Sequence, residues 1–138
     1  HNIYGPRMGN KHVMPELIQR IQKSKKELKI FGGNQTRAFC YIDDAIKYLY
    51  LLGNSKNFEF GIYHIGNSKE EIKIFKLVNL VLKLMNKKLK ITDKGEPPES
   101  VNRRCPNIKR IIKKTKYKPQ FNLKKGLKKT IEWYLNVK

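Results

Sequence analysis

Short apolar runs alternate with amphipathic stretches along the whole chain, which is the pattern of an α/β fold. The clearest helical periodicity covers residues 74–85, where apolar side chains recur every three or four positions. Pro15 lies in the first turn of a shorter helix, whose buried side is marked by Leu17 and Ile21. The chain is therefore expected to fold as short strands alternating with helices.

Acidic and turn residues set the boundaries of the other expected elements. Asp43 and Asp44 are expected to be the N-cap and first-turn acids of a helix that runs to about Leu52, because carboxylates stabilise the positive end of a helix. The expected strands cover residues 28–31, 38–42, 61–65 and 89–92, and the last two helices cover about 108–114 and 123–136.

The segment before the helix at 74–85 allows two interpretations. Ser68 and Glu71 form a capping box, or residues 71–74 first form a short extended stretch. Further along, Pro97 and Pro98 exclude a helix, so residues 95–102 are expected to form a loop. The chain contains no internal repeat.

Length and composition limit the classes of protein that remain. The 138 residues make one domain at most, and they begin at His1 in what reads as the middle of a motif, so we expect a piece whose missing part lies upstream. No apolar run approaches the roughly 20 residues that span a bilayer. Cys40 and Cys105 are too few for a disulfide framework or a zinc site, which favours a cytoplasmic location and no metal.

The net charge of +20 has two explanations. One is a small lysine-rich module that binds nucleic acid, supported by residues 103–129, which contain twelve basic residues and no acid. The other is genome composition, because 25 lysines, 15 isoleucines and 12 asparagines all have AT-rich codons. We favour the second explanation. The six arginines are then the more informative residues, since arginine is needed where a planar fork grips a phosphate.

Three segments carry residues that suit an anionic, base-containing ligand. The first segment, 2–14, has the amide of Asn2, Arg7 in a Gly-Pro turn, and His12 just ahead of the Pro15 helix. The second, 31–41, places Arg37 among aromatic residues, of which Phe31 and Phe39 suit a planar base. The third, 103–107, pairs two arginines before a helix capped by Asn107.

Each of these segments also has a simpler explanation. His12 is then a surface loop histidine, and the aromatic residues around Arg37 belong to the core. Arg37 itself is then neutralised by Asp43 or Asp44, and Arg103–Arg104 is an ordinary basic loop. No catalytic residue is assigned, because no glycine-rich dinucleotide loop follows a strand and no metal-ligand cluster is present.

Five blocks in order resemble the extended short-chain dehydrogenases that act on nucleotide sugars. They are Asn2-Ile3-Tyr4-Gly5-Pro6-Arg7 with His12-Val13-Met14-Pro15, Gln35 to Asp44, Tyr63 to Asn67, Arg103 to Asn107, and Gly126 to Tyr134. Together these blocks cover nearly the whole chain. The resemblance identifies NAD-dependent nucleotide-sugar epimerases and dehydratases as a family and selects no particular enzyme.

The resemblance implies that residues 1–138 are the C-terminal, nucleotide-sugar-binding portion of a Rossmann-type enzyme. The NAD-binding domain, with the catalytic tyrosine and lysine, is then absent from this chain, and the chain alone is expected to be inactive. A homodimeric parent enzyme is expected, with a nucleoside diphosphate sugar as its partner and with neither nucleic acid nor membrane.

The resemblance also implies roles for individual residues. Asn2 contacts the sugar near the nicotinamide, His12 and Val13 lie by the diphosphate and nucleoside, and Phe31 packs on the base. Arg37 and Arg104 grip the diphosphate, and Phe39 lines the pocket wall. Two departures from the family pattern affect the site: Asn107 stands where the family usually has aspartate, and the turn before Gln35 is one residue shorter.

Overall fold

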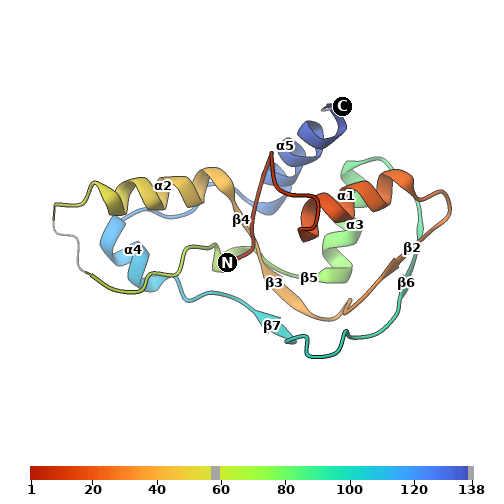
Figure 1. Cartoon of the computed structure of the whole chain (residues 1–138), viewed down its shortest axis with the longest axis horizontal. Coiled ribbons are helices and arrows are strands. Elements are labelled where there is room, and N and C mark those ends of the chain that lie inside the picture. Colours follow the sequence, from red (N-terminus) through yellow and green to blue (C-terminus); the bar gives the residue numbers. More distant parts are fainter. Residues whose placement is uncertain (57–59, 137–138) are drawn as a thin grey trace.

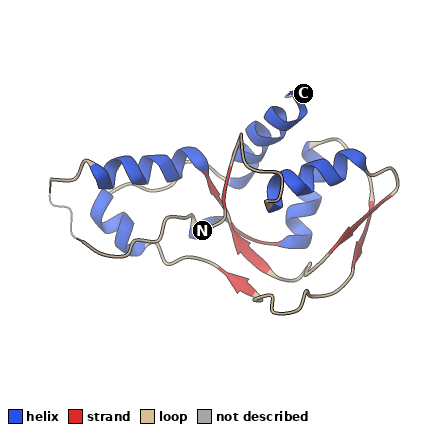
Figure 2. Cartoon of the chain, in the orientation of Figure 1, coloured by secondary structure: helices blue, strands red, loops and turns tan. Residues whose placement is uncertain are grey.

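The computed structural model describes residues 1–56 and 60–136, and the elements alternate between strand and helix (Figures 1 and 2). In chain order they are β1 (Ile3–Tyr4), α1 (Val13–Lys23), β2 (Glu27–Ile30), β3 (Thr36–Ala38), β4 (Cys40–Tyr41), α2 (Ile42–Gly53), the 3-10 turn η1 (Ser68–Glu70), β5 (Glu71–Lys73), α3 (Ile74–Leu84), β6 (Lys90–Asp93), β7 (Arg103–Arg104), α4 (Lys109–Thr115) and α5 (Leu123–Asn136). The expected α/β class is confirmed.

Three small sheets connect these elements. β1 pairs with β4 and β2 with β6, both in parallel. The third sheet has the order β5-β3-β7, in which β3 runs antiparallel to β5 and parallel to β7. Because β3 and β4 are separated by Phe39 alone, one extended segment joins two sheets and fixes their relative position.

Two apolar clusters hold the helices against these sheets. The larger one lies among α1, α3 and α5 and includes Ile21, Leu77 and Leu127, each fully buried. The smaller one joins α2 to α4 through Tyr48, Leu52 and Ile111. Figure 1 shows the corresponding arrangement, with α2 and α4 at one end of the molecule and α1, α3, β2 and β6 at the other. Apolar spacing at three and four residues predicts the buried positions of α1 and α3, including Ile21 and Leu77.

Asp44 is fully buried and holds the segment that precedes α5. Its Oδ1 accepts hydrogen bonds from the Tyr117 hydroxyl at 2.5 Å and from the Gln120 backbone N–H at 2.8 Å. Its Oδ2 accepts from the backbone N–H of Phe121 at 3.1 Å. A buried carboxylate is stable only when hydrogen bonds replace its water shell, so these donors are what permit its burial.

The expected strand at 38–42 is wrong in its extent. Ala38 ends β3, the next two strand residues form β4 in another sheet, and Ile42 already begins α2. The N-cap assignment is also wrong: Tyr41 is the N-cap of α2, and Asp43 and Asp44 both lie in its first turn. A carboxylate in the first turn stabilises the positive end of a helix without being its N-cap. Two adjacent acids at a helix start therefore look the same in the sequence whether or not the first of them is the N-cap.

The expected strand at 61–65 is also absent from the part of the chain that the structure describes. Residues 61–65 form no ladder with another described segment, and Ile62 is 80% exposed. An extended segment is a strand only when a neighbour takes up its backbone N–H and C=O groups. Here the terminal amine of His1 donates to the Ile65 carbonyl at 2.8 Å.

Two further boundaries follow from local pairing. Residues 71–73 form β5, so the extended alternative is confirmed there, and η1 replaces the capping box. Arg103 and Arg104, for which an ordinary basic loop was the simpler explanation, form β7 because they pair in register with β3. None of the described helices is long and apolar enough to cross a membrane.

Candidate functional site

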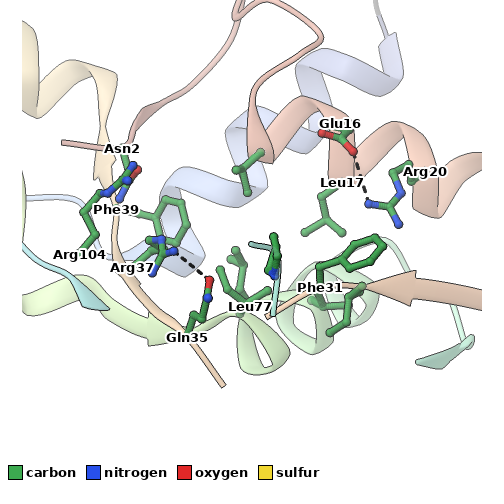
Figure 3. Close-up of a pocket in the computed structure, with 15 residues that line it drawn as sticks. Asn2, Glu16, Leu17, Arg20, Phe31, Gln35, Arg37, Phe39, Leu77 and Arg104 are labelled. Carbon is green, nitrogen blue, oxygen red and sulfur yellow. Dashed lines mark hydrogen bonds and ion pairs between the residues drawn. The ribbon is translucent and has the colours of Figure 1, made fainter. Parts of the chain in front are cut away.

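A cavity of about 380 Å³ opens between α1, the end of β2, β3 and α3 (Figure 3). Six of the seven residues selected from the sequence line it: Asn2, Val13, Phe31, Arg37, Phe39 and Arg104. Its other lining residues are Glu16, Leu17, Arg20, Ile30, Gln35, Ile74, Leu77, Val78 and Pro97. The predicted residues from positions 2 to 104 are therefore brought together at one site.

The register of the central sheet places two arginines side by side. Arg37 on β3 pairs with Arg104 on β7, and Thr36 pairs with Arg103. Because side chains alternate between the two faces of a strand, Arg103 points away from Arg104. Arg103 instead meets Glu71 of β5, with Nη2 at 2.8 Å from Oε2. Only Arg104 of this pair lines the cavity.

The guanidinium of Arg37 is fixed by neutral acceptors. Nη1 donates to the Thr36 carbonyl at 2.8 Å, and Nη2 donates to Gln35 Oε1 at 2.9 Å and to the Ser100 hydroxyl at 3.3 Å. Within residues 1–56 and 60–136, Arg37 forms no ion pair, so neither Asp43 nor Asp44 neutralises it. Burial lowers the pKa of Arg37, and the neighbouring Arg104 lowers it further. The group stays charged, because an arginine pKa lies far above neutral pH.

Apolar side chains form the opposite end of the cavity. Phe31 is 55% exposed at its rim, while Ile30 and Leu17 are buried beside it. On α1, Arg20 donates to the carboxylate of Glu16 at 3.4 Å and to the Lys29 carbonyl. Figure 3 shows Phe31 and Arg20 on one side of the cavity, and Asn2, Phe39 and Arg104 on the other. A flat ligand has a ring to lie on at one end and cations at the other.

Asn2 lies beside Arg104 in an uncommon backbone conformation. Its φ is +42°, a region that asparagine tolerates better than most residues. Its Nδ2 donates to the Ala38 carbonyl at 2.9 Å, which leaves Oδ1 without a partner among the described residues. Phe39, which is 3% exposed, lines this end of the cavity. Asn2 therefore presents an acceptor beside a group of donors.

His12 is the selected residue that the structure does not bring into the cavity. It is the N-cap of α1, is exposed, and makes no side-chain capping hydrogen bond. His12 borders a smaller neighbouring hollow, which it shares with Asn2, Val13 and Phe39. His12 therefore lies next to the cavity without lining it, whereas Val13 lines both hollows.

The charge balance of the cavity favours an anion. Arg20, Arg37 and Arg104 line it together with a single acid, Glu16, which is paired with Arg20. The two remaining arginines have no carboxylate to balance them in the described chain. In proteins, guanidinium groups commonly bind carboxylate or phosphate oxygens through paired hydrogen bonds.

Sequence reasoning selected Val13 of α1 but missed three other α1 residues at this site, namely Glu16, Leu17 and Arg20. Val13, Glu16, Leu17 and Arg20 recur at helical spacing and lie along one face that borders the cavity. Starting the helical pattern at Val13 rather than at Pro15 would have placed these three residues on the same helix face as Val13. Gln35 was also missed, because its importance depends on an atom whose surroundings only the fold reveals.

One tyrosine followed by a lysine four residues later was also overlooked. Tyr134 and Lys138 have this spacing, although Lys138 lies outside the described residues. The Tyr134 hydroxyl donates to the Met8 carbonyl at 2.6 Å, and Tyr134 does not line the cavity. This spacing therefore provides no acid–base group at the candidate site.

The sequence matches one known family and several known proteins. The NAD dependent epimerase/dehydratase family matches residues 1–66. Human dTDP-D-glucose 4,6-dehydratase is 31% identical across 96% of this chain, and the match spans 39% of that protein. UDP-glucuronic acid decarboxylase 1 of Xenopus tropicalis is also 31% identical, across 96% of this chain and 31% of its own length.

Comparison of the fold with solved structures also finds an epimerase of this kind. The crystal structure of UDP-glucuronic acid 4-epimerase from Bacillus cereus, in complex with UDP-glucuronic acid and NAD, superposes with a TM-score of 0.88. The identity is 27%, and the match covers 97% of this chain and 43% of that one. The chain thus spans about two fifths or less of the length of these relatives. The chain belongs to the NAD-dependent epimerase/dehydratase family, of which it represents a partial length.

Proposed function

We propose that this chain is the C-terminal, nucleotide-sugar-binding portion of an NAD-dependent epimerase or dehydratase. The observation that carries this proposal is the cavity itself, where Arg37 and Arg104 lie in register at one end and the Phe31 ring lies at the other. A nucleoside diphosphate sugar has the same order of chemical groups, with a flat base, two phosphates and a polar sugar.

The ligand is then bound by three kinds of contact. The base lies on Phe31, between this ring and the apolar residues of α1 and β2. The diphosphate accepts hydrogen bonds from Arg104 and Arg37. Its negative charge then balances the positive charge of these two arginines, which have no carboxylate partner among the described residues. The sugar lies toward Asn2, whose free Oδ1 accepts from a hydroxyl. In this orientation the chain holds the substrate and performs no bond-breaking step.

NAD is the cofactor that the family implies, and the residues present here do not fit it. A dinucleotide needs a glycine-rich turn that leads from a strand into a helix, where backbone N–H groups meet the pyrophosphate. The Gly32–Gly33 turn follows β2 but leads into β3. We therefore assign no residue of this chain to NAD, and propose that the cofactor and the catalytic tyrosine and lysine are supplied by another part of the protein. The chain alone is expected to be inactive.

The lysine-rich alternative has weaker support in the described region. Arg103 is held by Glu71, and the amines of Lys125 and Lys129 lie 4.7 and 5.2 Å from the centre of the Phe121 ring. Part of the basic segment is thus engaged with the protein's own carboxylate and aromatic groups. Scattered exposed lysines bind duplex DNA only through charge, which makes such binding depend steeply on salt.

Titration calorimetry on the 138-residue chain separates these functions. The panel contains UDP-, GDP-, CDP- and dTDP-sugars, and a duplex DNA is the competitor at 50 and 200 mM salt. The proposal expects saturable one-site binding of at least one nucleotide sugar, which Arg37→Met weakens while leaving DNA binding unchanged. Binding of DNA with no response to any nucleotide sugar would favour the nucleic-acid module instead.

A further inference from the structure

Gln35 contains an unsatisfied buried donor at the edge of the cavity. Its side chain is buried, with 4% of the residue exposed, and it lines the cavity together with Arg37. Its Nε2 is the one buried side-chain polar atom without a hydrogen-bond partner in residues 1–56 and 60–136. Buried amide groups nearly always have partners, so this atom calls for an explanation.

The orientation of the carboxamide is fixed by its other atom. Oε1 accepts from Arg37 Nη2 at 2.9 Å and from the Ser100 hydroxyl at 2.9 Å. An arginine can only donate, so turning the amide by 180° would set two donors against each other. Nε2 is therefore the atom that keeps two protons and has no acceptor among the described residues.

The backbone around Gln35 is equally constrained. Its N–H donates to the Gly32 carbonyl at 2.9 Å, and its carbonyl accepts from the Ile74 N–H at 3.0 Å. Gly32 has a φ of +62°, and a Cβ there would lie 2.7 Å from the Gln35 carboxamide. Because Gly32 has no Cβ, the Gln35 carboxamide can lie close to the backbone of this turn.

We propose that Gln35 is a third anion-binding residue of the cavity. When a diphosphate enters, Nε2 donates to one of its oxygens beside Arg37 and Arg104. Nε2 does not reach solvent in the present conformation, so the ligand reaches it through a small shift of the loop that carries Pro97 and Ser100. This inference rests on the proposed function, because it assumes that the cavity binds an oxyanion.

The direct test follows the Gln35 side-chain amide by ¹H–¹⁵N NMR. Its pair of signals is assigned by its loss in Gln35→Met, and the chain is titrated with inorganic pyrophosphate and then with UDP. The inference expects both amide protons to shift and to saturate together with the guanidinium signals of Arg37 and Arg104. Gln19 provides a matched control, because its Nε2 donates to Asn10 Oδ1 on the surface, and its signals should stay in place.

Affinity measurements separate direct donation from an effect through Arg37. One charge-assisted hydrogen bond corresponds to about tenfold or more in the pyrophosphate dissociation constant. If Gln35 only positions Arg37, then Gln35→Met has no further effect in an Arg37→Met background. If Nε2 donates to the ligand, the same loss of about tenfold persists in that background.

The outcomes bear separately on the inference and on the proposed function. Saturating shifts at Arg37 and Arg104 without a shift at Gln35 would overturn the inference and leave the proposed function intact. Absence of any shift at all three residues would contradict the proposed function, and with it the inference. Shifts at all three residues, together with a persistent affinity loss in the double variant, support both.

Discussion

Arg103 donates two parallel hydrogen bonds to Glu71, from Nε to Oε1 at 2.9 Å and from Nη2 to Oε2 at 2.8 Å. The pair joins β7 to β5 across β3, on the sheet face opposite the cavity. It thereby holds β7 against β3, in the register that sets Arg104 beside Arg37. The adjacent arginines have different tasks: one fixes the sheet and the other lines the cavity.

This pair makes the stability of the chain depend on pH. The hydrogen bond from Arg103, and then that from Thr36, lowers the pKa of Glu71 to about 2 from its ordinary value of 4.5. A lowered folded-state pKa stabilises the fold above the unfolded pKa, and this contribution is lost as the pH falls through the folded pKa. We expect the free energy of unfolding to fall between pH 4.5 and 2.

Urea unfolding followed by circular dichroism at several pH values measures this change. Glu71→Gln should flatten the profile between pH 4.5 and 2, because it removes the titrating group. Glu132→Gln, an exposed position on α5, is the matched control and should keep the slope. A slope equal to that of the unsubstituted chain in Glu71→Gln would show that the pair has no such role.

Asp44→Asn should destabilise the chain strongly. The Asp44 carboxylate accepts from the Tyr117 hydroxyl and from the backbone N–H groups of Gln120 and Phe121. Asparagine keeps one acceptor oxygen, but its NH₂ group replaces the other and sets a donor against a donor. We expect this loss to lower the free energy of unfolding by about 2–4 kcal/mol, because hydrogen bonds to a charged acceptor are stronger than those to a neutral one. Asp43→Asn, which is exposed, should change the unfolding free energy by about 0.5 kcal/mol or less.

Two glycines offer a matched test of packing. A Cβ on Gly126 of α5 would lie 2.2 Å from the Tyr4 hydroxyl and 2.8 Å from the Tyr41 ring, so Gly126→Ala should cost about 1–3 kcal/mol through overpacking. Gly53, at the end of α2, has no atom within 4 Å of such a Cβ. Gly53→Ala should stabilise the chain, by up to about 1 kcal/mol, through helix propensity. Thermal unfolding of both variants checks the contrast, and equal effects would contradict it.

Phe31→Ala should weaken nucleotide binding without weakening the fold. The ring is 55% exposed at the cavity rim, so it contributes little to the core. Loss of a stacked ring is expected to raise the dissociation constant of UDP by about tenfold. The affinity for pyrophosphate, which has no base, should not change. Phe75→Ala, at another partly exposed ring on α3, should leave both affinities unchanged.

The sequence predicted much of this fold because strong local signals coincide with it. The apolar spacing of 74–85 and the Pro97–Pro98 loop match α3 and the long loop before β7. It failed where pairing decides the structure. Arg103–Arg104 becomes a strand through its register with β3, and residues 61–65 form no strand because no described neighbour pairs with them. Local residue preference contains no information about such partners.

In the candidate site too, some features could be predicted from sequence motifs and others depend on the three-dimensional structure. Arg37, Phe31 and Asn2 were selectable because a motif marks them, and the fold brings them to one cavity. Arg104 was selected over Arg103 through the family resemblance, and the alternation of side chains along β7 supplies the structural reason. The orphaned amide of Gln35 depends on its three-dimensional surroundings, which no pattern along the chain expresses.

The most direct measurement of the central claim is the affinity of the chain for nucleoside diphosphates in the Arg104→Met variant. Arg110→Met is the control, because Arg110 lies on α4 and donates to the Ile62 carbonyl away from the cavity. We expect one-site binding that Arg104→Met weakens by about tenfold or more and that Arg110→Met leaves within about twofold. Absence of binding, or equal weakening by the two substitutions, would contradict the claim that this cavity binds a nucleotide sugar.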